Sequence, residues 1–113
     1  MIKNRNDELS RFTSFSLENK EELFKLLDSR PGIFIVRESE GLKNIVHIGT
    51  GVGKGGLRMR ISQIFNPGHL QSTNLRLRQL LKDKVPMDID YCFCESAESA
   101  KTLKEKLKQS TSF

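Results

Sequence analysis

Residues 32–36 read Gly32-Ile33-Phe34-Ile35-Val36, an uninterrupted apolar run that decides the fold. Successive side chains of an extended chain point to opposite sides, so Ile33 and Ile35 share one face while Phe34 and Val36 share the other. A strand with two apolar faces is typical of the centre of a sheet that is covered on both sides. The run therefore predicts a central strand over residues 32–38.

The residues around this strand predict a hairpin, a third strand and four helices. Glu40-Gly41 is a turn signal, and residues 44–49 return as the second strand of the hairpin. Before the hairpin, a helix capped by Ser16 or Asn19 carries Leu23, Leu26 and Leu27 in one apolar stripe. After the hairpin come a helix from Leu57, with Ile61, Ile64 and Phe65 in its stripe, and a helix from residues 72–74, with Leu77, Leu80 and Leu81. A strand over residues 89–94 and a helix from Ser96, with Ala97, Ala100, Leu103 and Leu107, complete the chain. The element order is α-β-β-α-α-β-α.

The length of the chain limits it to one domain. A chain of 113 residues buries a single core and leaves no room for a second catalytic domain. We expect a polar N-terminal segment over residues 1–15 and one domain over residues 16–113. No apolar run approaches the roughly 20 residues of a membrane helix, and the charged start lacks the apolar core of a signal peptide. These features predict a cytoplasmic protein without membrane contact.

The two cysteines predict no disulfide. Cys92 and Cys94 are two residues apart in an expected strand, so their side chains share a face and are poorly placed to bridge each other. A structural zinc site usually needs four ligands, and the chain has no second cysteine pair. We expect two free thiols in the core.

Two short runs and the helix after them resemble the signature of the GIY-YIG nucleases. The first run is Gly32-Ile33-Phe34, and the second, His47-Ile48-Gly49, begins thirteen residues after Phe34. From the first strand onward, the element order is also that of GIY-YIG domains. The resemblance implies an α+β fold with a small antiparallel three-stranded sheet flanked by helices. It also implies action on the phosphodiester bonds of nucleic acid, with DNA favoured over RNA.

The resemblance assigns catalytic roles to His47 and Arg60. Arg60 lies three residues after Leu57, as in the Leu-x-x-Arg run of the family, where a guanidinium neutralises charge on the phosphate. His47 stands in place of the second tyrosine and could take a proton from water, because imidazole titrates near neutrality. The alternative for His47 is a hydrogen-bonded structural role. Phe34 replaces the first tyrosine and has no proton to exchange.

The resemblance further implies Mg²⁺ or Mn²⁺ as the cofactor if the domain is catalytic. Family members carry the metal-binding acid on the last helix, where this chain has Lys104. Helical geometry turns Glu105 away from the apolar stripe, so Glu95, just before the helix, is the candidate metal ligand. Lysine at position 104 would repel a cation, yet it could stabilise phosphate charge.

The charge distribution predicts a polyanion partner. The net charge is +5, and the segment from Lys54 to Lys84 holds seven basic residues against one acid. Such a surface binds phosphate backbones through counterion release, although basic residues on helices are also common as a plain solvated face. The residues expected to contact nucleic acid are Lys54, Arg58, His69, Arg76 and Arg78.

The glycine-rich stretch from Gly49 to Gly56 precedes the helix that carries Arg60. Amides at a helix start can hold a phosphate, so we expect contact with a phosphate backbone, with a merely flexible turn as the alternative. The stretch is not a Walker loop, because Gly55 follows Lys54 where that motif needs Ser or Thr.

Two functions remain open from the sequence. In the first, the domain is a nuclease in which His47 activates water, Arg60 steadies the phosphorus centre and an acid holds the metal ion. In the second, it is a degenerate relative that binds nucleic acid or a protein partner without cleavage. The replaced tyrosines and acid favour the second function, whereas Arg60 and an ionisable group at position 47 favour the first. The resemblance to the family places the nuclease first and the binder as the alternative.

Overall fold

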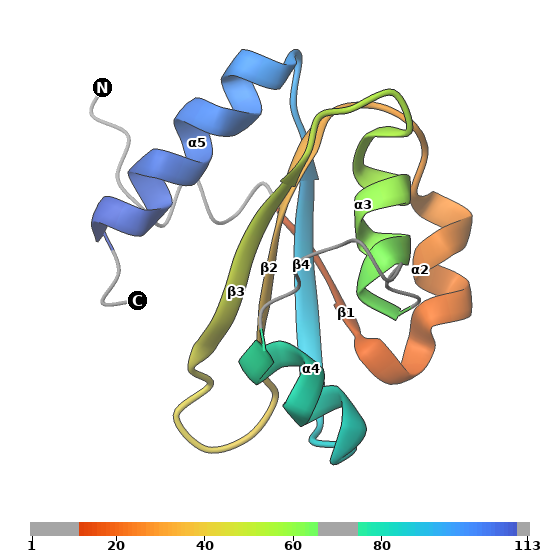
Figure 1. Cartoon of the computed structure of the whole chain (residues 1–113), viewed down its shortest axis with the longest axis vertical. Helices are drawn as coiled ribbons and strands as arrows, with labels where there is room; N and C mark the ends of the chain where they lie inside the picture. Colours follow the sequence, from red (N-terminus) through yellow and green to blue (C-terminus); the bar gives the residue numbers. More distant parts are fainter. Residues whose placement is uncertain (1–11, 66–74, 111–113) are drawn as a thin grey trace.

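A computed structural model describes residues 12–65 and 75–110. It shows one antiparallel sheet with the strand order β1-β4-β2-β3 (Figure 1). The strands are β1 (Thr13–Ser16), β2 (Gly32–Glu38), β3 (Ile45–Gly51) and β4 (Met87–Phe93). The strand predicted over residues 32–38 is β2, and it pairs with β3 on one side and β4 on the other. A small α+β domain with an antiparallel sheet is thus confirmed.

Helices cover both faces of this sheet. The helical elements are the 3₁₀ turn η1 (Leu17–Asn19) and the helices α2 (Lys20–Leu26), α3 (Gly56–Phe65), α4 (Leu75–Lys82) and α5 (Ala97–Ser110). Figure 1 shows α5 on one side of the sheet, with α2 and α3 on the other. Ser96 caps α5, since its Oγ accepts a hydrogen bond from the Ser99 amide at 3.1 Å. The predicted start of the helix after residue 72 lies outside the described residues.

The two faces of β2 belong to two separate cores. Phe34 and Val36 pack with buried residues of the first core, namely Leu23, Leu27, Val46, Leu57, Ile61, Ile64, Leu77, Met87, Ile89 and Tyr91. Ile33 and Ile35 pack with Ile48, Cys92 and Leu107 beneath α5. The sheet alternation that the sequence predicts is therefore confirmed on both sides. Both cysteines are free, and Cys92 is buried in the second core.

The expectation of three strands is wrong by one strand. β1 pairs antiparallel with β4 at the edge of the sheet, and Thr13 lies in the segment that we assigned to a polar N-terminal tail. A polar cluster fastens this strand. Ser14 Oγ donates to Asp90 Oδ1 at 2.5 Å, and Arg37 Nε donates to Asp90 Oδ2 at 2.6 Å. The four residues of β1 show little apolar alternation. They form a strand because β4 pairs with their backbone and the Asp90 carboxylate accepts a hydrogen bond from Ser14.

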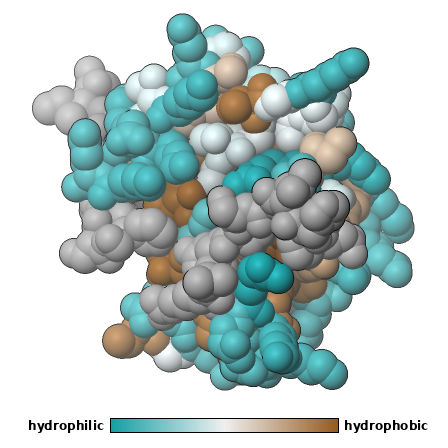
Figure 2. Space-filling model, in the orientation of Figure 1, coloured by the Kyte–Doolittle hydropathy of each residue, from teal (hydrophilic) through white to brown (hydrophobic). Residues whose placement is uncertain are grey.

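The visible surface is mostly hydrophilic. Figure 2 shows apolar side chains only as small separate areas on this face. Within the described residues, no helix has both the length and the apolar character needed to cross a bilayer.

Candidate functional site

The glycine-rich segment forms a fixed turn between β3 and α3. Gly56 has a φ of 61°, and a Cβ there would fall against the carbonyl oxygens of Ser29 and Arg30, so only glycine fits. The Leu57 amide then donates to the Arg30 carbonyl at 2.9 Å, which ties the start of α3 to the chain before β2. This contact orients the first turn of α3 and hence Arg60.

A cavity of about 260 Å³ lies between this turn and α3. Residues 50–56, which include Lys54, line it together with Met59, Arg60 and Gln63. Arg60 is half-buried, and its Nη1 donates to Gln63 Oε1 at 3.2 Å, so the guanidinium is held on the cavity side of the helix. A guanidinium with its five donors beside a glycine turn is a suitable site for a phosphate group.

His47 is half-buried on β3 and close enough to Arg60 for that charge to affect it. It pairs with Val36, so it lies on the same face of the sheet as Phe34 and α3. Burial lowers the pKa of His47 to about 4, and the positive charges of Arg60, Lys104 and Lys108 add to this effect. The imidazole is therefore neutral at pH 7. His47 does not line the cavity that holds Arg60.

Lys104 and Lys108 approach His47 from the other face of the sheet. Both lysines are on α5, and β3 is the last strand of the sheet that the described residues form, so side chains from either face can reach its outer side. Lys104 is half-buried. Burial lowers the pKa of the Lys104 ammonium, and Lys108 and Arg60 lower it further, whereas Glu105 opposes them. Among the described residues, His47 on β3 thus lies near a cluster of three cationic side chains, Arg60, Lys104 and Lys108.

A divalent metal ion does not fit this cluster. Each charged group that shifts the pKa of His47 is positive, so a second cation there would be repelled. Glu95, the predicted ligand, is exposed and lines a hollow with Ser96, Glu98 and Lys106, and this hollow shares no residue with the cavity at Arg60. Among the described residues, no three His, Cys, Asp or Glu side chains form a group that could bind a metal.

The other predicted contacts are dispersed. Arg58 binds the end of α2, since its Nη1 donates to the carbonyl oxygens of Phe24 and Leu27. Lys54 and Arg78 are exposed, but the glycine-rich turn and α4 lie at opposite ends of the sheet (Figure 1). His69 and the side chain of Arg76 lie outside the described residues. The basic run from Lys54 to Lys84 therefore spreads over both ends of the molecule.

Sequence reasoning missed Gln63 and Lys108. Both follow a predicted site residue along a helix, Gln63 at three residues from Arg60 and Lys108 at four residues from Lys104. Such spacings place side chains on one helical face. Helical spacing from a candidate residue was therefore the signal that could have found them.

Comparison with known proteins gives no relative. No family model matches the sequence, and neither a curated protein nor a solved structure matches it significantly.

Proposed function

We propose that this chain is a GIY-YIG-like domain that binds the phosphodiester backbone of nucleic acid, DNA rather than RNA, without cleaving it. The observation that carries the proposal is the position of Arg60. Its guanidinium lines a cavity with the glycine-rich turn, and its charge acts on both His47 and Lys104. Lys54 and Arg60 both line this cavity. Two cations at one hollow favour a ligand with concentrated negative charge, and phosphate groups provide it.

The strand arrangement supports the GIY-YIG part of the proposal. Phe34 and Gly49 are direct partners in the β2–β3 hairpin, so the two signature-like runs lie side by side. The helix with Arg60 follows at once, and α5 carries Lys104, which the resemblance aligns with the family's acid. A lysine there replaces a metal ion with a fixed positive charge, which binds phosphate but does not activate water.

Cleavage is the second candidate function, and one observation favours it. Neutral His47 lies near Arg60 and can accept a proton at pH 7. A group with a pKa of about 4 is, however, a weak base. It is a poor general base at pH 7, because proton transfer is most efficient when the pKa of the base lies near the working pH. We therefore place binding first and derive no metal-dependent step.

Fluorescence anisotropy with labelled single-stranded and duplex DNA tests the proposal. Arg60→Ala should weaken binding roughly tenfold and reduce the slope of log K against log salt by about one, as expected for one lost phosphate contact. Arg78→Ala removes the same charge from the exposed face of α4, at the other end of the sheet, and should weaken binding less. Equal effects of the two variants would contradict a site centred on Arg60.

The same DNA incubated with Mg²⁺ or Mn²⁺, and with EDTA as the control, tests cleavage. We expect intact DNA in every lane. Products that disappear with EDTA or in Arg60→Ala would establish the nuclease function instead.

A further inference from the structure

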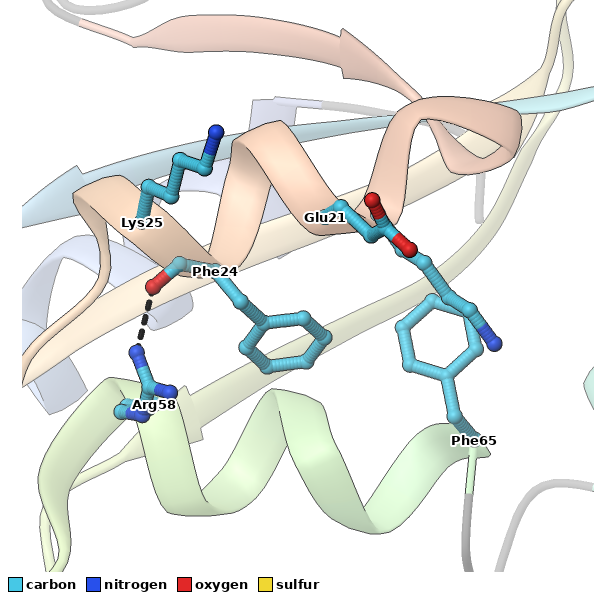
Figure 3. Close-up of a pocket in the computed structure, with 6 residues that line it drawn as sticks. Glu21, Phe24, Lys25, Arg58 and Phe65 are labelled. Carbon is cyan, nitrogen blue, oxygen red and sulfur yellow. Dashed lines mark hydrogen bonds between the residues drawn. The ribbon is translucent and has the colours of Figure 1, made fainter.

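A second hollow lies on the opposite side of α3. Six residues of α2 and α3 line it, namely Lys20, Glu21, Phe24, Lys25, Arg58 and Phe65 (Figure 3). We call it the α2–α3 groove. Its volume of about 600 Å³ is within the range of roughly 300–1,000 Å³ that small-ligand pockets occupy.

Two aromatic rings form the apolar part of the α2–α3 groove. Phe24 and Phe65 meet edge to face, with ring centroids 5.9 Å apart and planes inclined at 68°. Both are only partly buried, although they pack against the first core. Figure 3 shows the two rings between the helices. Partly exposed rings provide apolar faces on which a planar group can stack.

Cations surround these rings. The Lys20 ammonium lies 5.5 Å from the centre of the Phe65 ring, and the Arg58 guanidinium lies 5.5 Å from the centre of the Phe24 ring. The groove lining holds three basic residues against one acid, Glu21. Aromatic rings with cations beside them are the combination that binds unpaired bases together with their phosphates.

The position of the groove connects it to the Arg60 cavity. Arg58 and Phe65 line the groove, whereas Arg60 and Gln63 line the cavity, so the two hollows flank the same helix. Met59 belongs to the exposed side of α3 between them and is 53% exposed. A helix with its side chains is about 10–12 Å across, a span that a short run of nucleotides covers.

We infer that the α2–α3 groove binds an unpaired base of single-stranded DNA whose backbone crosses α3 from the Arg60 cavity. This inference rests on the proposed function and adds the strand type and a base-binding subsite. Lys20 lies beside the Phe65 ring, where it contacts the backbone next to the stacked base. Duplex DNA keeps its bases paired and cannot fill the groove.

The test compares two ligands on the unaltered protein. One is a labelled oligothymidylate, and the other is the same oligonucleotide with abasic sites throughout. Base stacking on aromatic side chains contributes about 1–3 kcal/mol per base, so the wild type should bind oligothymidylate roughly tenfold more tightly than the abasic strand. Equal affinities would overturn the groove inference and leave backbone binding intact. Absence of binding to both ligands would overturn the proposed function itself.

Substitution of Phe65 locates the preference in the groove. Phe65→Leu should abolish the difference between the two ligands by weakening the binding of oligothymidylate. Phe15→Leu is the matched control, because Phe15 is also partly buried against the first core but lies outside the groove. The chain has no tryptophan, so Phe65→Trp also places a single tryptophan in the groove. Its emission should be quenched by oligothymidylate and not by the abasic strand, and equal quenching by both would also overturn the inference.

Discussion

The rings of Phe34 and His47 lie beside each other across the β2–β3 pair, with centroids 5.6 Å apart and planes inclined at 46°. Phe34 is fully buried, whereas His47 is half-buried towards the cations of α3 and α5. Gly49 makes room for both, since a Cβ there would lie 2.8 Å from Phe34 Cε1 and 3.0 Å from His47 Nε2. In the signature that the chain resembles, tyrosines occupy these two positions. In this chain the first of these positions lies in the core, and the second carries a neutral imidazole.

The low pKa of His47 predicts a dependence of stability on pH. The pKa is about 4 in the folded protein against an ordinary value of 6.5, so the unfolded chain binds more protons between these values. The free energy of unfolding should therefore fall as the pH drops from about 6.5 to about 4. Urea denaturation at pH 7 and pH 4.5 measures the effect. His47→Phe should lose less stability over this interval than the wild type, and an equal loss would contradict the shifted pKa.

Ligand binding should reverse part of this shift. A phosphate beside Arg60 and Lys104 offsets the positive charges that now lower the pKa of His47, so the pKa should rise when DNA binds. Proton NMR can follow the imidazole signals, because the chain has only two histidines, and His69→Gln assigns them. A His47 pKa that stays the same in free and bound protein would place the phosphate elsewhere.

The turn before α3 should be sensitive to a single methyl group. Gly56→Ala places a residue with a Cβ at a φ of 61°, which strains the backbone, and drives that Cβ against the Ser29 carbonyl. It should therefore destabilise the fold by at least about 2 kcal/mol. Gly41 has a similar φ of 67° but no atom within 4 Å of its added Cβ. Gly41→Ala should therefore cost only the backbone strain. Thermal unfolding compares the variants, and equal losses would show that the Ser29 contact does not matter.

Asp90 should be required for the attachment of β1. It is 8% exposed and binds both Arg37 and Ser14. Removal of one member leaves a largely buried charge without its partner, so Asp90→Ala should destabilise the protein by about 2–4 kcal/mol. Ser14→Ala removes one hydroxyl and should cost about 1 kcal/mol. Hydrogen exchange should quicken first at the β1 amides, and uniform quickening across the sheet would contradict a local role.

Sequence periodicity predicts this fold well where one segment carries its own pattern. The strand β2 has the predicted bounds of residues 32–38. The helices α3 and α5 bury the faces that their apolar stripes predict. β1 escaped prediction because its pairing with β4 is a tertiary effect. The same limit applies to the site. Arg58 and Arg60 are both basic positions on one helix. Only the contact between α2 and α3 shows that Arg58 binds carbonyl oxygens of α2, whereas Arg60 lines the cavity at the glycine-rich turn.

The last prediction tests what Lys104 of α5 contributes to binding. Lys104→Glu replaces a half-buried cation by the acid that the resemblance to the GIY-YIG signature implies at this position. The new carboxylate would lie near His47 and Arg60, where it should raise the pKa of His47 and partly neutralise Arg60. We therefore expect DNA binding without metal to weaken roughly tenfold, because one attractive charge becomes repulsive.

Addition of Mg²⁺ tests whether the missing acid alone accounts for the expected lack of cleavage. If the acid is the only missing group, Lys104→Glu should show Mg²⁺-dependent cleavage that Arg60→Ala abolishes in the double variant. Lys104→Gln is the control, because it removes the charge without supplying a ligand, and it should bind DNA with intermediate affinity and never cut. Lys104→Glu that binds in the presence of Mg²⁺ but leaves all DNA intact would mean that Phe34 and His47 also prevent catalysis. Unchanged binding of Lys104→Glu without metal would instead remove Lys104 from the phosphate site.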